Sequence, residues 1–384
     1  MGTVKLSKEE FENLDFNSEK VKTLSVQFQK ETGKIAVWRG AITEGFISWL
    51  KGELDVSSYI VFQDQRFLAN GSVTLYMEGK GVESINQLQG LDTLSSLRKL
   101  NLSDNVLKGI SNLDNLKKLE FLSLARNKIT QIEGLNQLKN LTHLNLSGNE
   151  ISRIDGLDNL KNLTNLDLSK NNITEVSGLD NLTNLKHLSL GYNSISSIKG
   201  LENLMNLQTL YLHNNNITNI EGLENLIDLG KLDLKLNNIK KIENLDKLYK
   251  LGILCLDGNQ IGVIEGLENL INLVELNLGA NRIKEIRGLN TLQRLSNLDL
   301  VNNQIKEIKD LESLKALKSL NLAKNRISEI KNLRDLVNLR ELDLSMNDIS
   351  ELKGLDGLKL DKFWILDNPL PQGIMFEIFR KYGK

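Results

Sequence analysis

The chain has 384 residues, of which 40% are hydrophobic, but its leucines are spread very unevenly. Of 76 leucines, six lie in residues 1–74 and seventy lie from Leu75 onward. The 48 basic and 49 acidic side chains give a net charge of −1, so the chain lacks the excess of cations that nucleic acid binding requires. Because Cys255 is the one cysteine, an intrachain disulfide and a multi-cysteine zinc site are both excluded.

The same composition bears on cellular location. The first residues, MGTVKLSKEEFENLDF, lack the apolar core of a secretory signal. No run of 18 apolar residues occurs anywhere in the sequence, so no membrane span and no membrane partner are expected. These features predict a cytoplasmic protein.

Residues 1–74 predict a separate, small α+β module. VKTLSVQFQ alternates apolar and polar residues and indicates a strand, KETGK indicates a turn, and IAVWRG indicates a second strand. In AITEGFISWLKGE, Ile42, Phe46 and Leu50 are four residues apart, as in a helix. IVF at 60–62 and VTLYM at 73–77 are further strand candidates. The module serves as a cap for the rest of the chain or binds a ligand of its own.

From residue 75 onward the sequence repeats. LTHLNLSGNEISRIDGLDNLKN at 141–162 and LTNLDLSKNNITEVSGLDNLTN at 163–184 match position for position. VTLYMEGKGVESI fits the same frame weakly, with Lys80 where asparagine is expected, and indicates a degenerate first repeat. An asparagine recurs at this constant spacing, which shortens only before its last member: Asn105, Asn127, Asn149, Asn171, Asn193, Asn215, Asn237, Asn259, Asn281, Asn303, Asn325, Asn347 and Asn368.

Each repeat combines two periodicities. Leu144 and Leu146 alternate with polar residues, which indicates a short strand with one buried face. After the asparagine, Ile151, Ile154 and Leu157 come every third residue, which fits a 3₁₀-like coil better than an α-helix. One repeat cannot bury these side chains alone, so the repeats must stack. The sequence therefore predicts an α/β solenoid over residues 75–370, of about 13 repeats, with a parallel concave sheet and a 3₁₀-like convex side.

The asparagines are predicted to be structural. Where the strand turns away, its backbone groups lose their sheet partners, and an amide offers two donors and an acceptor to replace them. At the C-terminus, Pro369 and Pro371 interrupt the repeat, and Met375, Ile378 and Phe379 then share one helical face with Tyr382. Residues 371–384 are therefore expected to form a cap helix over the last repeat.

The recurring pattern LxxLxLxxNxIxxIxGL resembles the leucine-rich repeats typified by the regulatory subunit of type-1 protein phosphatase. The resemblance covers about residues 75–370 and implies a horseshoe fold. In that regulator the residue between the strand leucines contacts the phosphatase, and Ser189, Tyr211 and Asp233 resemble part of that column. Bacterial internalins also use units of this length, but theirs carry a proline in the return segment and are exported. We therefore expect the intracellular branch of the family.

The candidate functional residues stand on the predicted concave face. Most solvent-facing strand positions carry small polar residues, so large apolar, aromatic or imidazole groups there have no packing reason. Three aromatics and all three histidines, His143 among them, fall on this face. The predicted partner-binding residues are Phe121, His187, Tyr192, Tyr211, His213, Asp233, Lys235, Leu236, Ile253, Cys255 and Trp364.

These residues do not predict catalysis. Cys255 is two repeats from His213, so their backbones are about 10 Å apart or more, too far for a nucleophile and its base. His143 and His187 are also two repeats apart, too far for one metal ion. No enzyme activity, metal or cofactor is expected.

Three functions are consistent with this pattern. The first is a scaffold, monomeric until bound, that recognises a protein partner through its concave face. The second is regulation of a type-1-like phosphatase by the same face, which the resemblance implies. The third places the specific binding activity in residues 1–74, with the solenoid as a structural arm.

Overall fold

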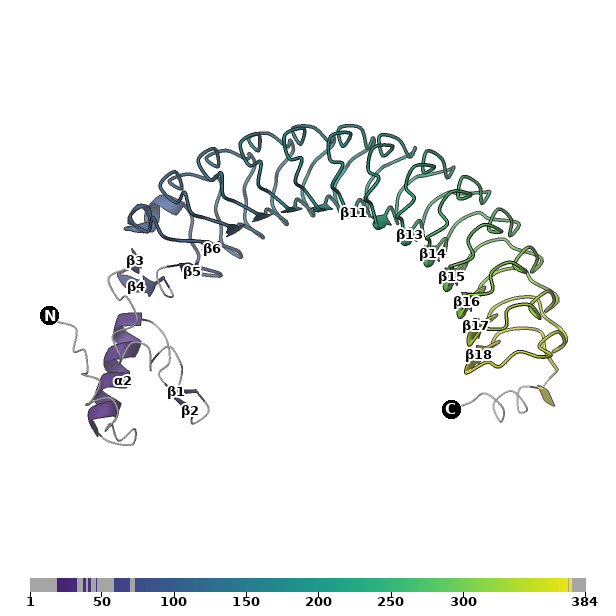
Figure 1. Ribbon diagram of the computed structural model, residues 1–384. Helices are drawn as coiled ribbons and strands as arrows, with labels where there is room; N and C mark the ends of the chain where they lie inside the picture. Colours follow the sequence, from purple (N-terminus) through teal and green to yellow (C-terminus); the bar gives the residue numbers. More distant parts are fainter. Residues whose placement is uncertain are drawn as a thin grey trace. The chain divides into compact units, whose positions relative to one another are not determined.

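The computed structural model describes residues 19–32, 37–38, 41–42, 46, 59–69, 73–371 and 373–374 (Figure 1). The chain forms two compact units: Met1–Ile151 with Asp155–Leu163, and Ser152–Ile154 with Thr164–Lys384. The division falls inside the repeats, so the predicted boundary between residues 74 and 75 stays a prediction. None of the helices in the described part combines the length and apolar character that a membrane span needs.

The first element of the described residues is the helix α2, Glu19–Thr32, where the sequence predicted a strand. That prediction was wrong because two patterns coexist here. Val21, Leu24 and Phe28 are three and four residues apart and all are buried, which defines a helical face. Val26, which completed the apparent alternation, is 67% exposed.

Two short antiparallel pairs follow. β1 (Val37–Trp38) pairs with β2 (Ala41–Ile42), and β3 (Tyr59–Phe62) pairs with β4 (Gln65–Leu68). The predicted strands at IAVWRG, IVF and VTLYM are confirmed by β1, β3 and β5. The predicted helix at 41–53 is wrong at its start, where β2 lies. Phe46 is helical, fully buried and 5.2 Å from the Phe28 ring, and the other residues of that segment lie outside the described ones.

Fourteen strands of three residues carry the repeats within the described part of the chain. The first unit contains β5 (Thr74–Tyr76), β6 (Lys99–Asn101), β7 (Phe121–Ser123) and β8 (His143–Asn145), with the short 3₁₀ helices η1 (Ile85–Gln87) and η2 (Leu91–Thr93). The second unit contains β9 (Asn165–Asp167), β10 (His187–Ser189), β11 (Thr209–Tyr211), β12 (Lys231–Asp233), β13 (Ile253–Cys255), β14 (Glu275–Asn277), β15 (Asn297–Asp299), β16 (Ser319–Asn321), β17 (Glu341–Asp343) and β18 (Lys362–Trp364).

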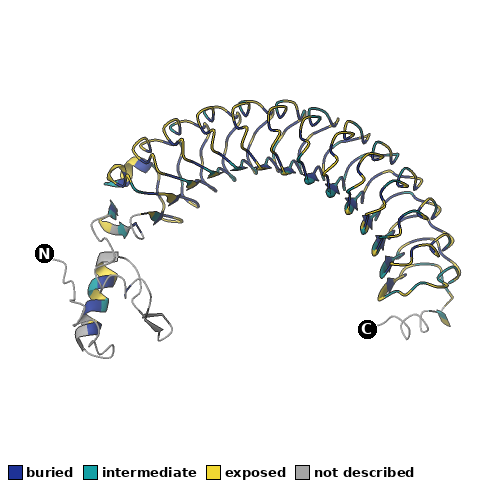
Figure 2. Cartoon of the chain, viewed as in Figure 1, coloured by how far each residue is buried: buried dark blue, intermediate teal, exposed yellow. Residues whose placement is uncertain are grey.

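Within each unit the strands of the repeats, from β5 onward, are parallel and in register. Leu188 of β10 aligns with Leu210 of β11, which aligns with Leu232 of β12, so equivalent leucines form a continuous buried row. In Figure 2 buried and exposed residues alternate along every repeat. The return segment has i→i−3 bonds, such as Leu204 N–H to Leu201 O at 2.9 Å, the pattern of a 3₁₀ coil. The predicted leucine-rich-repeat solenoid with a parallel sheet and a 3₁₀-like return side is confirmed.

The asparagine side chains join successive repeats. The Asn215 Nδ2 group donates to Leu212 O of its own repeat at 3.0 Å and to Leu190 O of the preceding one at 3.0 Å. Its Oδ1 accepts from the Ile195 N–H at 2.9 Å. In the degenerate first repeat, Lys80 N–H and its neighbour Val82 N–H donate to Asn105 Oδ1. Each amide therefore replaces sheet bonds that the backbone loses where the strand ends.

The predicted C-terminal cap helix falls mostly outside the described residues. Gly373–Ile374 begins a helical turn, and Ile374 N–H donates to Pro371 O at 3.1 Å. Met375, Ile378, Phe379 and Tyr382 lie outside the described part, so the cap over the last repeat stays a prediction.

Candidate partner-binding surface

Nine of the eleven predicted partner-binding residues lie on or directly after four adjacent strands, β10 to β13, of the second unit. Phe121 lies on β7 in the other compact unit, and Trp364 lies on β18, five strands beyond β13. Within the second unit the strands line the inner side of the curve (Figure 1). We call these nine residues the concave patch: His187, Tyr192, Tyr211, His213, Asp233, Lys235, Leu236, Ile253 and Cys255.

The position between the two strand leucines has a structural role that the sequence analysis missed. At most repeats an Asp or Asn there accepts the N–H two residues later, as when Asp299 Oδ1 accepts from Val301 N–H at 2.9 Å. Tyr211 and Cys255 cannot make this bond, so these repeats give up a local stabilising contact. The residues that accept it are Asn101, Asn145, Asp167, Asp233, Asn277, Asp299, Asn321 and Asp343.

Two tyrosines and a histidine form an aromatic cluster. The His213 ring lies edge-on to Tyr192 at 5.2 Å and to Tyr211 at 6.2 Å. A Cβ at Gly191 would lie 2.6 Å from His213 Cε1, so the ring fits because residue 191 has no side chain. The His213 ring therefore packs closely over the backbone at Gly191 and contacts both tyrosines.

Asp233 is buried beside this cluster, in contact with His213. It is only 5% exposed, and its Oδ2 lies 3.4 Å from His213 Nδ1 and 3.8 Å from Lys235 Nζ. The His213 contact is an ion-pair distance without the alignment of a hydrogen bond. Burial raises the pKa of Asp233, but its interactions with the His213 ring, the Lys235 N–H and the Lys235 side chain more than offset this, so the pKa lies below its usual range. Asp233 therefore positions other patch residues.

Tyr192 and Leu236 are held in the left-handed backbone region, with φ of 56° and 55°. They occupy the position directly before the repeat asparagine, where φ is positive in the other repeats too, whether the residue is Gly258, Lys170 or Met346. Bulky side chains are disfavoured in this region by about 1–2 kcal/mol. Each is nonetheless 49% exposed. Met346, 46% exposed with a φ of 56°, shares these features, so Tyr192 and Leu236 are distinguished by their place among the aromatic residues of β10 to β13.

The remaining patch residues extend the cluster along the sheet. His187 is exposed, and Ile253 and Cys255 are half-buried on β13. Cys255 and His213 belong to repeats separated by β12, and burial together with the nearby Asp233 raises the Cys255 pKa to about 11. Such a thiol is almost entirely protonated at neutral pH and is a poor nucleophile. Within the described residues no group of three His, Cys, Asp or Glu side chains could hold one metal ion.

Alkylation of Cys255 by iodoacetamide is therefore expected to be slow at pH 8. Its rate should rise about tenfold per pH unit until the pH approaches the thiol pKa, because the thiolate is the reactive form. Rates measured by intact-mass spectrometry between pH 7 and 10 test this. A rate that is already constant above pH 8 would contradict the buried environment described for the thiol.

Phe121 and Trp364 stand apart from the patch. Phe121 is 36% exposed and its ring lies 6.2 Å from the His143 ring on the next strand. Trp364 is 41% exposed on β18, aligned with Asp343 of β17. The structure does not bring Trp364 near Tyr211, so the eleven predicted residues do not form a single cluster.

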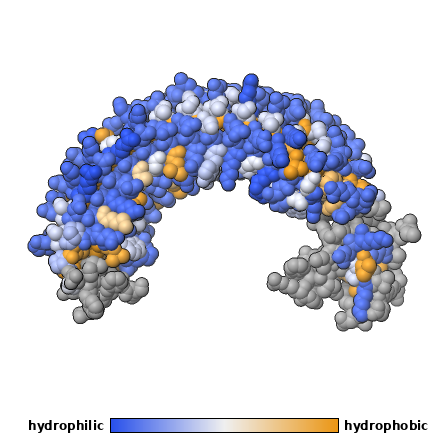
Figure 3. Space-filling model, turned by 180° about the vertical axis from the view of Figure 1, so that it is seen from behind, coloured by the Kyte–Doolittle hydropathy of each residue, from blue (hydrophilic) through white to orange (hydrophobic). Residues whose placement is uncertain are grey.

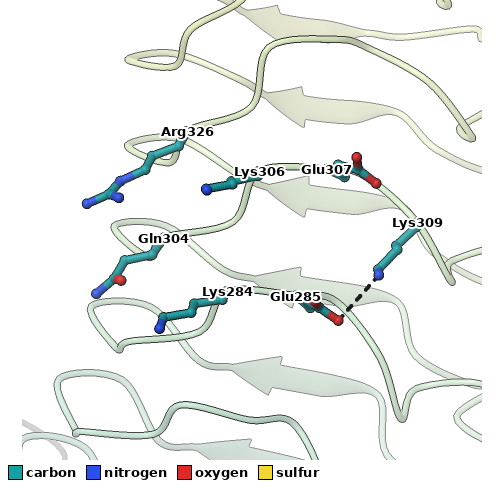
Figure 4. A pocket seen from close by; sticks show the side chains of 7 residues that line it. All are labelled: Lys284, Glu285, Gln304, Lys306, Glu307, Lys309 and Arg326. Carbon is teal, nitrogen blue, oxygen red and sulfur yellow. Dashed lines mark hydrogen bonds and ion pairs between the residues drawn. The ribbon is translucent and has the colours of Figure 1, made fainter.

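A second surface feature was missed because its residues are ordinary surface charges. Lys284, Gln304, Lys306 and Arg326 extend to one side of an open hollow of about 520 Å³, and Lys309 pairs with Glu285 on the other side at 3.3 Å (Figure 4). The hollow is polar and unlike the aromatic patch. Its residues become noticeable only when the same position is compared from one repeat to the next.

Comparisons with known proteins agree with this architecture. A family model for leucine-rich repeats in two copies matches residues 95–137, 139–181, 161–203, 183–225, 206–250, 293–334 and 315–357. The chain belongs to the leucine-rich-repeat family. No curated protein matches it.

Three solved structures are similar to the chain. An internalin from Listeria monocytogenes has 33% identity and a TM-score of 0.69, over 75% of this chain and 86% of that one. A leucine-rich-repeat protein from Leptospira interrogans has 25% identity and a TM-score of 0.69, over 80% and 93%. The TLR13–ssRNA13 complex has 28% identity and a TM-score of 0.65, over 77% of this chain and 47% of that one. These structures include an internalin and no phosphatase regulator, so they do not support the expected preference for the phosphatase branch.

Proposed function

We propose that the chain is a protein-binding scaffold whose concave patch recognises a partner protein. The observation that carries this proposal is the Tyr192–His213–Tyr211 cluster together with the exposed Leu236 of the next repeat, all on or directly after neighbouring strands. Rigid aromatic side chains at the centre of a surface are the commonest anchors of protein interfaces. An intracellular location stays a prediction from the sequence.

The net charge of the chain favours a protein over a nucleic acid. The chain as a whole carries −1, and Asp233 offsets one lysine of the patch, Lys235. Binding of RNA, which the TLR13 structure contains, depends on cations that neutralise phosphates. Lys170 and Lys231 lie over the rings of Tyr192 and Tyr211 at 5.6 and 5.2 Å and act as part of the aromatic surface.

Regulation of a type-1-like phosphatase is a narrower second proposal. It rests on the row Ser189, Tyr211 and Asp233, which the register aligns on neighbouring strands. Asp233 is 5% exposed and already paired, so it offers little surface to a phosphatase. The general scaffold is therefore better supported. A binding role for residues 1–74 stays a prediction.

A double substitution separates binding from folding. In Tyr211→Asn with Leu236→Asn, each new asparagine stands where other repeats have one, such as Asn277 and Asn302. We expect an unchanged or higher urea midpoint, because the Asx bond is restored and Leu236 strain is relieved. Partner recovery in affinity purification with quantitative mass spectrometry should fall at least about tenfold.

The matched control is Met346→Asn, which makes the same change at the same repeat position, where φ is 56°. Met346 is 46% exposed and lies five repeats from Leu236, so this variant should recover the same partners as wild type. Equal recovery by the double variant and wild type would rule out the concave patch as the binding surface.

A further inference from the structure

The second unit has an exposed apolar row outside the concave patch. It lies on the segment that returns to the strand, five residues before the first strand leucine of the next repeat. Most of the surface visible in Figure 3 is hydrophilic, so a row of exposed apolar side chains is unusual. We call this row the edge stripe: Met205, Ile227, Tyr249 and Ile271, with exposed fractions of 57%, 51%, 53% and 54%.

The edge stripe breaks the periodic pattern of its own column. The equivalent position is apolar in four consecutive repeats and polar in the repeats on either side, apart from the isolated Val337. Packing therefore places no demand for an apolar residue there. The other members of the column are Ser95, Lys117, Lys139, Lys161, Thr183, Gln293, Lys315 and Val337.

The surroundings of the stripe extend its apolar character. Between the stripe and the strands, the next column holds Gln208 beside Met205, and then Gly230, Gly252 and Val274 beside the other three stripe residues. Val274 is 41% exposed, and the two glycines have no side chain and are half-buried. On its strand side the stripe is therefore bordered by residues without polar side chains at three of its four repeats.

A row of carboxylates accompanies the stripe on its other side. Glu202, Glu224, Asp246 and Glu268 each precede a stripe residue by three positions. The i→i−3 bonds here, such as Leu207 N–H to Leu204 O at 2.9 Å, place residues three apart on the same face. None of these four acids makes an ion pair within the described residues.

The stripe is regularly spaced because the repeats touch at this edge. Asn206 Nδ2 donates to Thr183 O at 2.8 Å, and Asn272 Nδ2 donates to Tyr249 O at 2.7 Å. Stacked parallel repeats advance by about 5 Å, close to the 5.4 Å pitch of an α-helix. A helix lying across the repeats can therefore place one apolar side chain per turn against each stripe residue.

We propose that the edge stripe binds a basic amphipathic helix of a partner protein. The helix's apolar face covers Met205, Ile227, Tyr249 and Ile271, and lysine or arginine side chains along its flank meet the row of carboxylates. This surface is separate from the concave patch, and the proposal does not rest on the function proposed for that patch.

The test uses the full chain and a fluorescent peptide of leucine and lysine patterned as an amphipathic helix of about five turns. Two further peptides are a scrambled sequence and a twin with glutamate in place of lysine. The stripe variant is Ile227→Gln with Tyr249→Gln. Glutamine occurs naturally at the equivalent position, as Gln293, and leaves the net charge unchanged. Val337→Gln is the matched control at the isolated apolar position of the same column.

We expect fluorescence anisotropy to show binding of the leucine–lysine peptide by wild type and by Val337→Gln, and at least about tenfold weaker binding by Ile227→Gln with Tyr249→Gln. The patch variant Tyr211→Asn with Leu236→Asn should bind the peptide as wild type does. Equal affinity of the stripe variant and wild type, or equal affinity for the glutamate twin, would overturn the proposal. A wild-type dimer in sedimentation velocity that the stripe variant converts to monomer would also overturn it, in favour of a second copy of the chain.

Discussion

Replacing Asn215 by alanine is expected to lower the free energy of unfolding by at least about 2 kcal/mol. The substitution removes four bonds: from the Asn215 amide to Leu190 O, Leu212 O and, at 3.4 Å, His213 O, and from Ile195 N–H to Asn215 Oδ1. Asn215 is only 7% exposed, so water cannot readily replace them. Each buried backbone group left without a partner costs about 1–3 kcal/mol.

The control for this experiment is Asn216→Ala, which removes the same side chain from the next, exposed position. Asn216 makes no side-chain hydrogen bond within the described structure, although its N–H donates to Ile195 O. Its free energy of unfolding, measured by urea denaturation, should match that of wild type within about 0.5 kcal/mol. Equal midpoints for the two variants would contradict the role assigned to the repeat asparagines.

The second large effect is expected for Gly200→Ala. Gly200 has a φ of 100°, and a Cβ there would lie 2.1 Å from Val176 O and 3.1 Å from Val176 C. Both atoms belong to the backbone of the preceding repeat, so relief of the clash requires the two repeats to move apart. Together with the unfavourable φ, this should cost about 2 kcal/mol or more.

Gly262→Ala provides the comparison. Nothing lies within 4 Å of a Cβ at that position. The substitution should leave the urea midpoint unchanged or raise it slightly, because alanine restricts the unfolded chain more than glycine does. If Gly200→Ala were as stable as Gly262→Ala, the close contact between the backbone at Gly200 and Val176 O would be contradicted.

The repeats were predictable because their signals agree at every level. The strand leucines, the three-residue spacing of the return segment and the asparagine period all predict the same stacked unit. The N-terminal helix was not predictable from alternation, since Leu24 and Phe28 fit a strand and a helix equally well. The burial of Val21, three residues before Leu24, and the exposure of Val26 in the folded chain distinguish the two.

The candidate site was predictable in part. Departures from the repeat consensus identified Tyr211, His213 and Leu236, which the structure brings onto neighbouring strands. Burial of Asp233 was not predictable, because it depends on how the His213 ring packs over Gly191. The edge stripe was missed because single exposed apolar residues are common, and only a comparison down one column reveals the run of four.

The most direct test of the scaffold proposal is hydrogen–deuterium exchange of the full chain with and without a partner recovered by wild type. We expect slower exchange on binding in residues 187–192, 209–213, 231–236 and 253–257, which carry the concave patch. Exchange in the equivalent segments of β15 and β16 should not change. Slower exchange confined to residues 1–69, or to the convex return segments, would contradict recognition through the concave face.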